Sequence, residues 1–198
     1  MTRLKRQQNK KAGFTLIELM VATVVFTSIM LASMGSLFVT LNAARNSKAM
    51  RLAMDNVNFA MESMTRSIRM GTYYYCVLNG ETMPSNNDVT SYQNCSNGGT
   101  LIAFVPQKTY SSNRVGYKLT SRTDGSGTHS LQRCDIDGCV DIVSSAVDIE
   151  KLLFFVNGSA PLPDTTQASV YIIIKGTVTV KGVPTSFAIQ TMASQRNF

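Results

Sequence analysis

The stretch Lys11-Ala12-Gly13-Phe14-Thr15-Leu16-Ile17-Glu18-Leu19-Met20 opens a long apolar run near the beginning of the chain. Basic residues precede Gly13, and the run that follows it carries one carboxylate, Glu18, close to its start. No residue from Leu19 to Ala44 is charged. As a helix, this uncharged run would be about 39 Å long, enough to cross the ~30 Å hydrocarbon core of a bilayer. The sequence therefore predicts one membrane-spanning helix.

The order of a basic leader, Gly13, Phe14, Glu18 and a long uncharged run resembles the processing site of type IV prepilins and prepseudopilins. The resemblance implies that a prepilin peptidase cuts after Gly13 and methylates the new amino terminus at Phe14. Without the residues around Gly13, a plain single-pass membrane anchor would be the simpler interpretation. An ordinary secretory signal fits less well, because its apolar region spans about 7–15 residues and its cleavage site follows that region.

Glu18 is the chemically distinctive residue, because an acid in an apolar helix needs a positive partner or a proton. The resemblance implies that its carboxylate meets the terminal amine of a neighbouring subunit, which recruits subunits and sets their register. Two desolvated ions add little net affinity but can fix a register. The alternative is an interfacial carboxylate that only reaches water among the lipid headgroups.

The formal net charge of +7 is concentrated in the leader. Five of the 19 Lys and Arg residues lie before Gly13, where no acid occurs, so the rest of the chain holds 14 basic against 12 acidic residues. Under the positive-inside rule, the leader stays in the cytoplasm and the remainder is exported. We therefore expect a single-pass inner-membrane protein with its head in the periplasm or outside the cell. Nucleic-acid binding is not favoured.

Residues 14 to about 70 read as one helix without a proline. Gly35 weakens it by up to about 1 kcal/mol relative to alanine. The resemblance favours a role in local flexibility, and the alternatives are close helix packing or no role at all. After Leu41, apolar residues recur at spacings of three and four, which predicts a stripe that packs on a globular head. The stripe consists of Met50, Met54, Val57, Met61, Met64 and Ile68. A surface for neighbouring subunits is the alternative use of this stripe.

The four cysteines, Cys76, Cys95, Cys134 and Cys139, all follow the apolar run. An even number on the exported side favours disulfides in an oxidising compartment. Of the three possible pairings we favour Cys76–Cys95 with Cys134–Cys139, because each bond closes a local, turn-rich loop. A zinc site fits poorly, since C-x-x-C spacing is absent and His129 is the single histidine.

The remainder of the chain predicts an antiparallel sheet laid against the second half of the helix. Residues 71–100 read as a long loop pinned by the first disulfide, and a late hairpin turns around Lys181-Gly182. The expected strands are residues 100–105, 114–119, 130–133, 140–143, 147–156, 169–180 and 185–191.

The expected fold class is α+β and pilin-like, a long N-terminal helix packed on an antiparallel β-sheet head. Its predicted parts are a cleaved leader (1–13), a membrane-spanning or filament-core half of the helix (14–41), an amphipathic half (42–71) and a globular head (72–198).

No pattern in the head predicts catalysis. A Gly-x-Ser-x-Gly elbow, a P-loop and a dinucleotide fingerprint are all absent, so we expect neither an enzyme nor a cofactor. Asp135, Asp137 and Asp141 form a weak calcium candidate, because clustered carboxylates suit that ion. The ligand pattern is incomplete, and an aspartate-rich turn is the alternative.

These features together predict a minor pilin or pseudopilin that helps to initiate, or is incorporated into, a type IV pilus or a type II secretion pseudopilus. Residues 187–198 resemble the end of J-type pseudopilins and related minor pilins, while the cysteines favour a pilus-associated subunit. The expected partners are the prepilin peptidase, other pilins or pseudopilins, the inner-membrane assembly platform and the membrane itself. The alternatives are a pilus-tip adhesin, a membrane-tethered binding module that never assembles, and an exported enzyme on an anchor.

Overall fold

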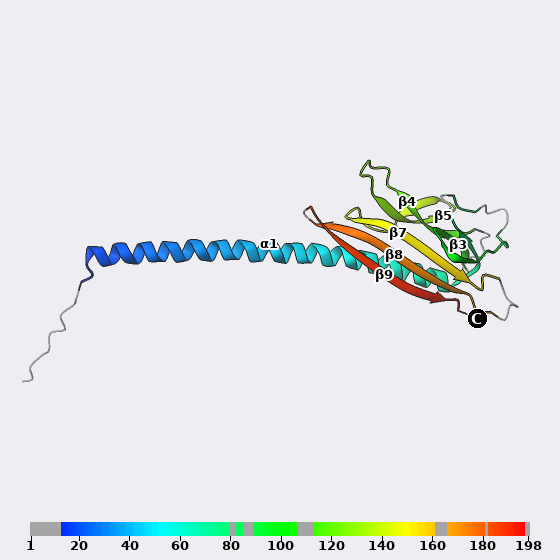
Figure 1. Ribbon diagram of the computed structural model, residues 1–198, viewed down its shortest axis with the longest axis horizontal. Coiled ribbons are helices and arrows are strands. Elements are labelled where there is room, and N and C mark those ends of the chain that lie inside the picture. The colour runs from blue at the N-terminus through cyan, green and yellow to red at the C-terminus, as the bar shows by residue number, and fades with distance from the viewer. Residues whose placement is uncertain are drawn as a thin grey trace, which may run out of the picture. The chain divides into compact units, whose positions relative to one another are not determined.

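The computed structural model describes residues 13–79, 82–84, 89–106, 113–160, 166–180 and 182–196. The chain divides into two compact units, residues 1–45 and residues 46–198. One helix, α1 (Leu16–Arg69), contributes to both units, as expected from the sequence, and the strands in the described ranges all belong to the second unit (Figure 1).

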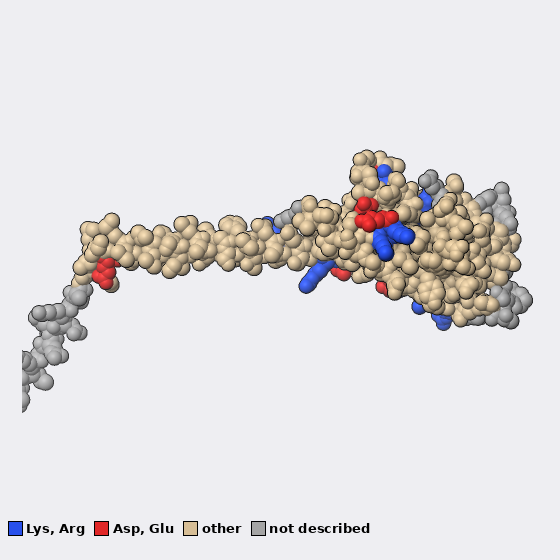
Figure 2. Space-filling view, viewed as in Figure 1, with Lys and Arg blue, Asp and Glu red and all other residues tan. Residues whose placement is uncertain are grey.

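The first half of α1 exposes apolar side chains on every face, and in Figure 2 its surface is uncharged apart from one acidic patch at its start. Five of its hydroxyl groups form hydrogen bonds within the helix. Thr23, Thr27, Ser28, Ser33 and Thr40 each donate to a carbonyl oxygen three or four residues earlier, at 2.8–3.0 Å. These internal bonds remove the cost of bringing a bare hydroxyl into apolar surroundings. By length and composition alone, α1 is the one helix in the described ranges that could cross a membrane.

The second half of α1 buries the predicted apolar stripe. Val57, Met61, Met64 and Ile68 are buried in a core shared with both sheets, and Met50 and Met54 pack partly buried against it. Two alanines that the sequence pattern did not include, Ala53 and Ala60, are buried on the same face. The stripe therefore packs on the head, as the spacing predicted.

The strands of the second unit form two antiparallel sheets rather than one. The five-stranded sheet has the order β1-β3-β4-β5-β6, and its strands are β1 (Gly71–Val77), β3 (Leu101–Pro106), β4 (Val115–Ser121), β5 (His129–Asp135) and β6 (Gly138–Asp141). The four-stranded sheet has the order β2-β7-β8-β9, and its strands are β2 (Cys95–Gly99), β7 (Val147–Asn157), β8 (Ser169–Val180) and β9 (Val183–Ser194).

The prediction of one long loop over residues 71–100 was wrong, because this segment contains β1 and β2. Tyr74 in β1 is buried, whereas β2 reads Cys-Ser-Asn-Gly-Gly and has little strand propensity of its own. The Cys76–Cys95 disulfide and the pairing of β2 with β7 hold β2 in an extended conformation. Tertiary contacts thus override the local preference for a loop.

The late hairpin was predicted correctly. Strands β8 and β9 pair from Ser169↔Ser194 to Val180↔Val183, which leaves a two-residue turn. Gly182 in that turn has φ +80°, a conformation that glycine adopts without steric cost and that two-residue hairpin turns require. Lys181 lies outside the described residues.

Helix α1 passes into β1 without room for a side chain at the junction. A Cβ on Gly71, the first residue of β1, would stand 2.5 Å from Cδ2 of the buried Phe104, so packing favours glycine at this position. The end of the sheet returns to the same place, because the backbone N–H of Arg196 donates to the carbonyl oxygen of Arg69 at 2.9 Å. The segment that follows β9 therefore lies beside the last turn of α1.

Candidate functional site

The first turn of α1 carries the residues that the sequence singled out. Gly13, Phe14 and Thr15 precede the helix, and the side chain of Phe14 is 84% exposed. Thr15 is the N-cap, since its Oγ1 accepts a hydrogen bond from the backbone N–H of Glu18 at 3.3 Å. Thr-x-x-Glu is the spacing of a capping box. This signal is present in the sequence, but the sequence-based interpretation of Glu18 did not include it. Glu18 thus has a local role in starting the helix as well as any role between subunits.

Glu18 stands at one end of an apolar face of α1. Val21, Ala22, Val25 and Ile29 follow it on the same face, at the three- and four-residue spacing of a helix. Along the described stretches of the chain, no lysine, arginine or histidine forms an ion pair with its carboxylate. The carboxylate of Glu18 is therefore exposed beside this apolar face.

Gly35 lies within an unbroken helix. A Cβ added there would meet nothing within 4 Å, so the residue is not required by packing inside this chain. Its role as a point of flexibility stays a prediction.

The cysteines pair as the loop argument favoured. Cys76 in β1 bonds to Cys95 in β2, and both are buried, so this disulfide joins the two sheets within the core. Cys134 bonds to Cys139 across the hairpin of β5 and β6, where the two residues face each other in the strand register. One disulfide therefore fixes the relation between the sheets, and the other stiffens a single hairpin.

The three aspartates of the calcium candidate are not brought together. Asp141 receives hydrogen bonds from Arg122 at 2.8 Å and from Gln132 at 2.9 Å, and Asp135 accepts one from the backbone N–H of Asp137 at 3.1 Å. Within the ranges that the structure describes, no cluster of three or more His, Cys, Asp or Glu side chains could hold a metal ion. The arrangement is that of an aspartate-rich turn.

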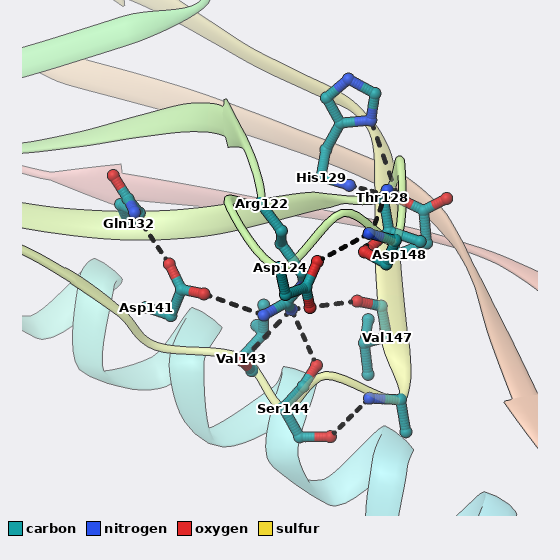
Figure 3. A network of polar contacts seen from close by, with 12 residues as sticks. Arg122, Asp124, Thr128, His129, Gln132, Asp141, Val143, Ser144, Val147 and Asp148 are labelled. Carbon is teal, nitrogen blue, oxygen red and sulfur yellow. Dashed lines mark hydrogen bonds and ion pairs between the residues drawn. The ribbon is translucent and has the colours of Figure 1, made fainter.

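Arg122 is the centre of a polar network that sequence reasoning missed (Figure 3). Its side chain is 7% exposed, and its Nη2 donates to the carbonyl oxygens of Ser144 at 2.9 Å and Val147 at 3.3 Å while Nη1 pairs with Asp141. The backbone N–H of Ser144 donates in turn to Oδ1 of Asn56 on α1, at 2.7 Å. The network ties the β4–β5 region to the helix and occupies the carboxylate of Asp141. An arginine after a strand has no sequence signature that would reveal this.

The comparisons with known proteins point to the same end of the chain. Residues 8–34 match the family described as the prokaryotic N-terminal methylation motif. The searches among curated proteins and among solved structures found no match for this chain.

The matched motif indicates a protein of the type IV pilin and pseudopilin type, and it spans Gly13, Phe14 and Glu18. It implies processing by a prepilin peptidase and assembly with other pilins, and it suggests a structural subunit rather than an enzyme. The exposed apolar half of α1 is compatible with membrane anchoring. The match does not extend to the head.

Proposed function

We propose that this chain is a minor pilin or pseudopilin, processed between Gly13 and Phe14 and then incorporated into a type IV pilus or a type II secretion pseudopilus. The observation that carries the proposal is the first turn of α1. There an exposed carboxylate without a cation among the described residues borders an apolar helix face, four residues after Phe14. After cleavage, Phe14 would carry a charged amine, and methylation keeps that charge.

The geometry of one helix argues for a partner outside the chain. The amine of Phe14 would sit at the positive end of its own helix, where the first-turn amides already favour the negative charge of Glu18. An amine from a neighbouring copy, shifted along the helix direction, would bring an opposite charge to Glu18 and place two apolar helix faces against each other. The ion pair would then define the shift, and the apolar faces would supply most of the association.

The apolar half of α1 would serve in two environments in turn. In the membrane its exposed side chains contact lipid, and in a filament they would contact equivalent helices. The internal hydroxyl bonds of Thr23, Thr27 and Ser33 suit both environments, because they need neither water nor a partner. The head would remain outside the membrane in either state, so we propose an inner-membrane, single-pass subunit before assembly.

Mass spectrometry of the mature protein tests the processing step. The expected result is an amino terminus at N-methylated Phe14, and a Gly13→Val variant should keep residues 1–13 while still entering the membrane. The Gly13→Val variant is informative because a Cβ added at Gly13 would meet nothing within 4 Å among the described residues, so we expect the folded part of the chain to be unchanged. An unprocessed wild-type chain, or a terminus at another residue, would contradict the proposal.

Co-purification tests the assembly step. Filaments sheared from cells, or membranes solubilised in mild detergent, should yield this chain together with other pilin-type subunits. A chain that stays a monomer in the membrane fraction after correct processing would instead be a tethered binding module. Binding of the protein to host cells or polymers, with pilus number unchanged on deletion, would favour the tip adhesin.

A further inference from the structure

A groove lies in the second unit between the last turns of α1 and strand β9. It has a volume of about 620 Å³, and its lining combines the apolar residues Met61, Met70 and Ile189 with uncharged polar residues on both elements, Asn58, Thr65, Gln190 and Thr191. Strand β9 ends the four-stranded sheet, so this side of it faces no further strand in the described part of the chain. The groove therefore offers apolar side chains at the open edge of a sheet.

The rim of this groove is basic. Arg66, Arg69 and Arg196 border it, against one acid, Glu62, which pairs with Arg66 at 2.9 Å. The Arg66–Glu62 pair is largely exposed and adds little to stability, so both side chains can exchange partners readily. The side chain of Arg69 makes no ion pair or hydrogen bond to any residue in the described ranges. An occupant with an apolar centre and acidic flanks would complement this rim.

Backbone and amide bonds keep the groove in shape. The N–H of Arg196 donates to the carbonyl oxygen of Arg69 at 2.9 Å, and Nε2 of Gln195 donates to that of Gly71 at 3.1 Å. These bonds fix the end of β9 beside the end of α1. A site that is already formed loses less conformational entropy when it is occupied.

The chain itself carries a segment of the complementary composition. Asp135, Ile136 and Asp137 form the tip of the β5–β6 hairpin, and the side chain of Ile136 is 62% exposed between the two acids. Asp135 accepts the backbone N–H of Asp137 at 3.1 Å and has Arg133 at 3.6 Å. The carboxylate of Asp137 has no ion-pair partner in the part of the chain that the structure describes.

The hairpin that presents this tip is stiff and has an open edge. The Cys134–Cys139 disulfide joins its strands directly behind the tip, and every residue of β6 is exposed. Strand β6 ends the five-stranded sheet, whereas the groove borders the edge of the four-stranded sheet. The tip and the groove therefore lie at different edges of one head.

We propose that the β5–β6 hairpin tip of one copy of this chain docks in the α1–β9 groove of a second copy. Ile136 would contact Met70 and Ile189 in the groove, and Asp137 and Asp135 would face Arg69 and Arg66. Because the two surfaces differ, the contact between two neighbouring copies is head-to-tail rather than a symmetric pair. This inference rests on the proposed function, since one small contact needs the apolar helices to hold the heads at a high effective concentration.

Photo-crosslinking in cells tests the contact with the full chain. A photoreactive amino acid at position 136 should give a crosslinked dimer of this protein, with the crosslink mapped to residues 58–70 or 189–196. A crosslink to a different protein, or to another surface of this chain, would overturn the proposal. So would the absence of any crosslink in cells where the chain still co-purifies with other pilin-type subunits, an outcome that leaves the proposed function standing.

Charge reversal gives a second readout. Arg69→Glu and Asp137→Lys should each lower the yield of crosslinked dimer by about tenfold, because each places like charges opposite one another. Combining the two changes should restore the yield. Lys175→Glu, an exposed reversal on β8, serves as the matched control and should leave the yield unchanged. An equal loss of crosslinked dimer in the Lys175→Glu control, or no recovery of yield in the double variant, would contradict the proposed contact between Arg69 and Asp137.

Discussion

The phenol hydroxyl of Tyr74 donates to the backbone carbonyl oxygen of Ile68 at 2.7 Å, so strand β1 closes the last turn of the helix from which it departs. The carbonyl oxygen of Gly71 lies at the same distance and shares this donor. Carbonyl groups at a helix C-terminus have no partner within the helix, and here a buried tyrosine supplies one. The hydroxyl of Tyr74 thereby joins the first strand of the five-stranded sheet to the C-terminal end of the helix.

Tyr74→Phe should lower the free energy of unfolding by about 1–3 kcal/mol, because it leaves a buried carbonyl group without its donor. Chemical denaturation of the full chain in detergent measures the change. Tyr171→Phe is the matched control, since Tyr171 is on β8 and half exposed, and it should stay within about 0.5 kcal/mol of the parent chain. Equal effects at the two positions would contradict the role of the Tyr74 hydroxyl.

Stability should fall as pH rises above 10. Burial raises the pKa of Tyr74 above its ordinary value of 10.0, and burial also raises the pKa of Tyr117. Below pH 10 both the folded and the unfolded chain hold these protons; above it the unfolded chain releases them while the folded chain retains them, so unfolding becomes more favourable. Unfolding curves from pH 8 to 11 should show this decline. Tyr74→Phe should make the decline shallower, and an unchanged slope in that variant would count against it.

Substitutions can separate the helix-capping role of Thr15 from the assembly role proposed for Glu18. Glu18→Gln removes the charge but keeps a residue type that capping boxes use at this position, so the helix should begin at the same place while co-purification with other subunits falls by at least about tenfold. Thr15→Ala removes the cap, costs about 1 kcal/mol of helix stability and should leave co-purification nearly intact. Quantitative immunoblots of sheared or solubilised material compare the two. If Thr15→Ala impaired assembly as strongly as Glu18→Gln, the start of the helix rather than the charge would be responsible.

The two disulfides should differ in reactivity. Cys139 lies on an exposed strand, whereas Cys76 and Cys95 are buried in the core between the sheets. Because Cys134 is itself buried, mild reduction followed by alkylation should label Cys139 first, well before Cys76 and Cys95. Mass spectrometry of the labelled peptides reports the order, and early labelling of Cys76 would show that the core opens more easily than its burial indicates.

Removing each bond should have unequal cost. Replacing Cys76 and Cys95 by alanine should destabilise the head by about 3 kcal/mol, and replacing Cys134 and Cys139 by about 2 kcal/mol, because the first bond closes the longer loop. The sequence separations are 19 and 5 residues. Denaturation under identical conditions checks the ranking. The reverse ranking would mean that the hairpin contributes more to the folded head than its exposed edge indicates.

Gly35 offers a test of flexibility in α1. Gly35→Ala should stabilise the helix by up to about 1 kcal/mol without any clash, since a Cβ there meets nothing within 4 Å. If local melting at this position is needed for assembly, the same variant should reduce incorporation into filaments although it is more helical. Circular dichroism and filament counts together decide the matter, and full incorporation of a more helical variant would leave Gly35 without that role.

The features that could be predicted from the sequence depend on periodicity and on turn chemistry. Leu16–Arg69, the buried face through Val57 and Met64, and the β8–β9 hairpin all follow from local patterns. Strand β2 does not, because its extended form depends on β7 and on a disulfide bond rather than on its own residues. The split into two sheets escaped prediction for the same reason.

The candidate sites likewise divide into one that local sequence could predict and one that depends on tertiary packing. Gly13, Phe14 and Glu18 stand within a few residues of one another, so their order alone carried the prediction. The groove bordered by Arg69 and Arg196 joins residues more than a hundred positions apart, and only the packing of β9 beside α1 brings them together. No local pattern in either segment predicts such a groove.

The backbone of α1 is one ladder of hydrogen bonds from Leu16 to Arg69, and no proline interrupts it. Tension applied to its apolar half would pass along the same ladder that holds Val57 and Met64 among the strands. A force along the helix axis would act in shear on all the core contacts of the helix at once. These contacts would therefore not break one after another. Under traction, the head should therefore keep its shape until the helix slides as a whole.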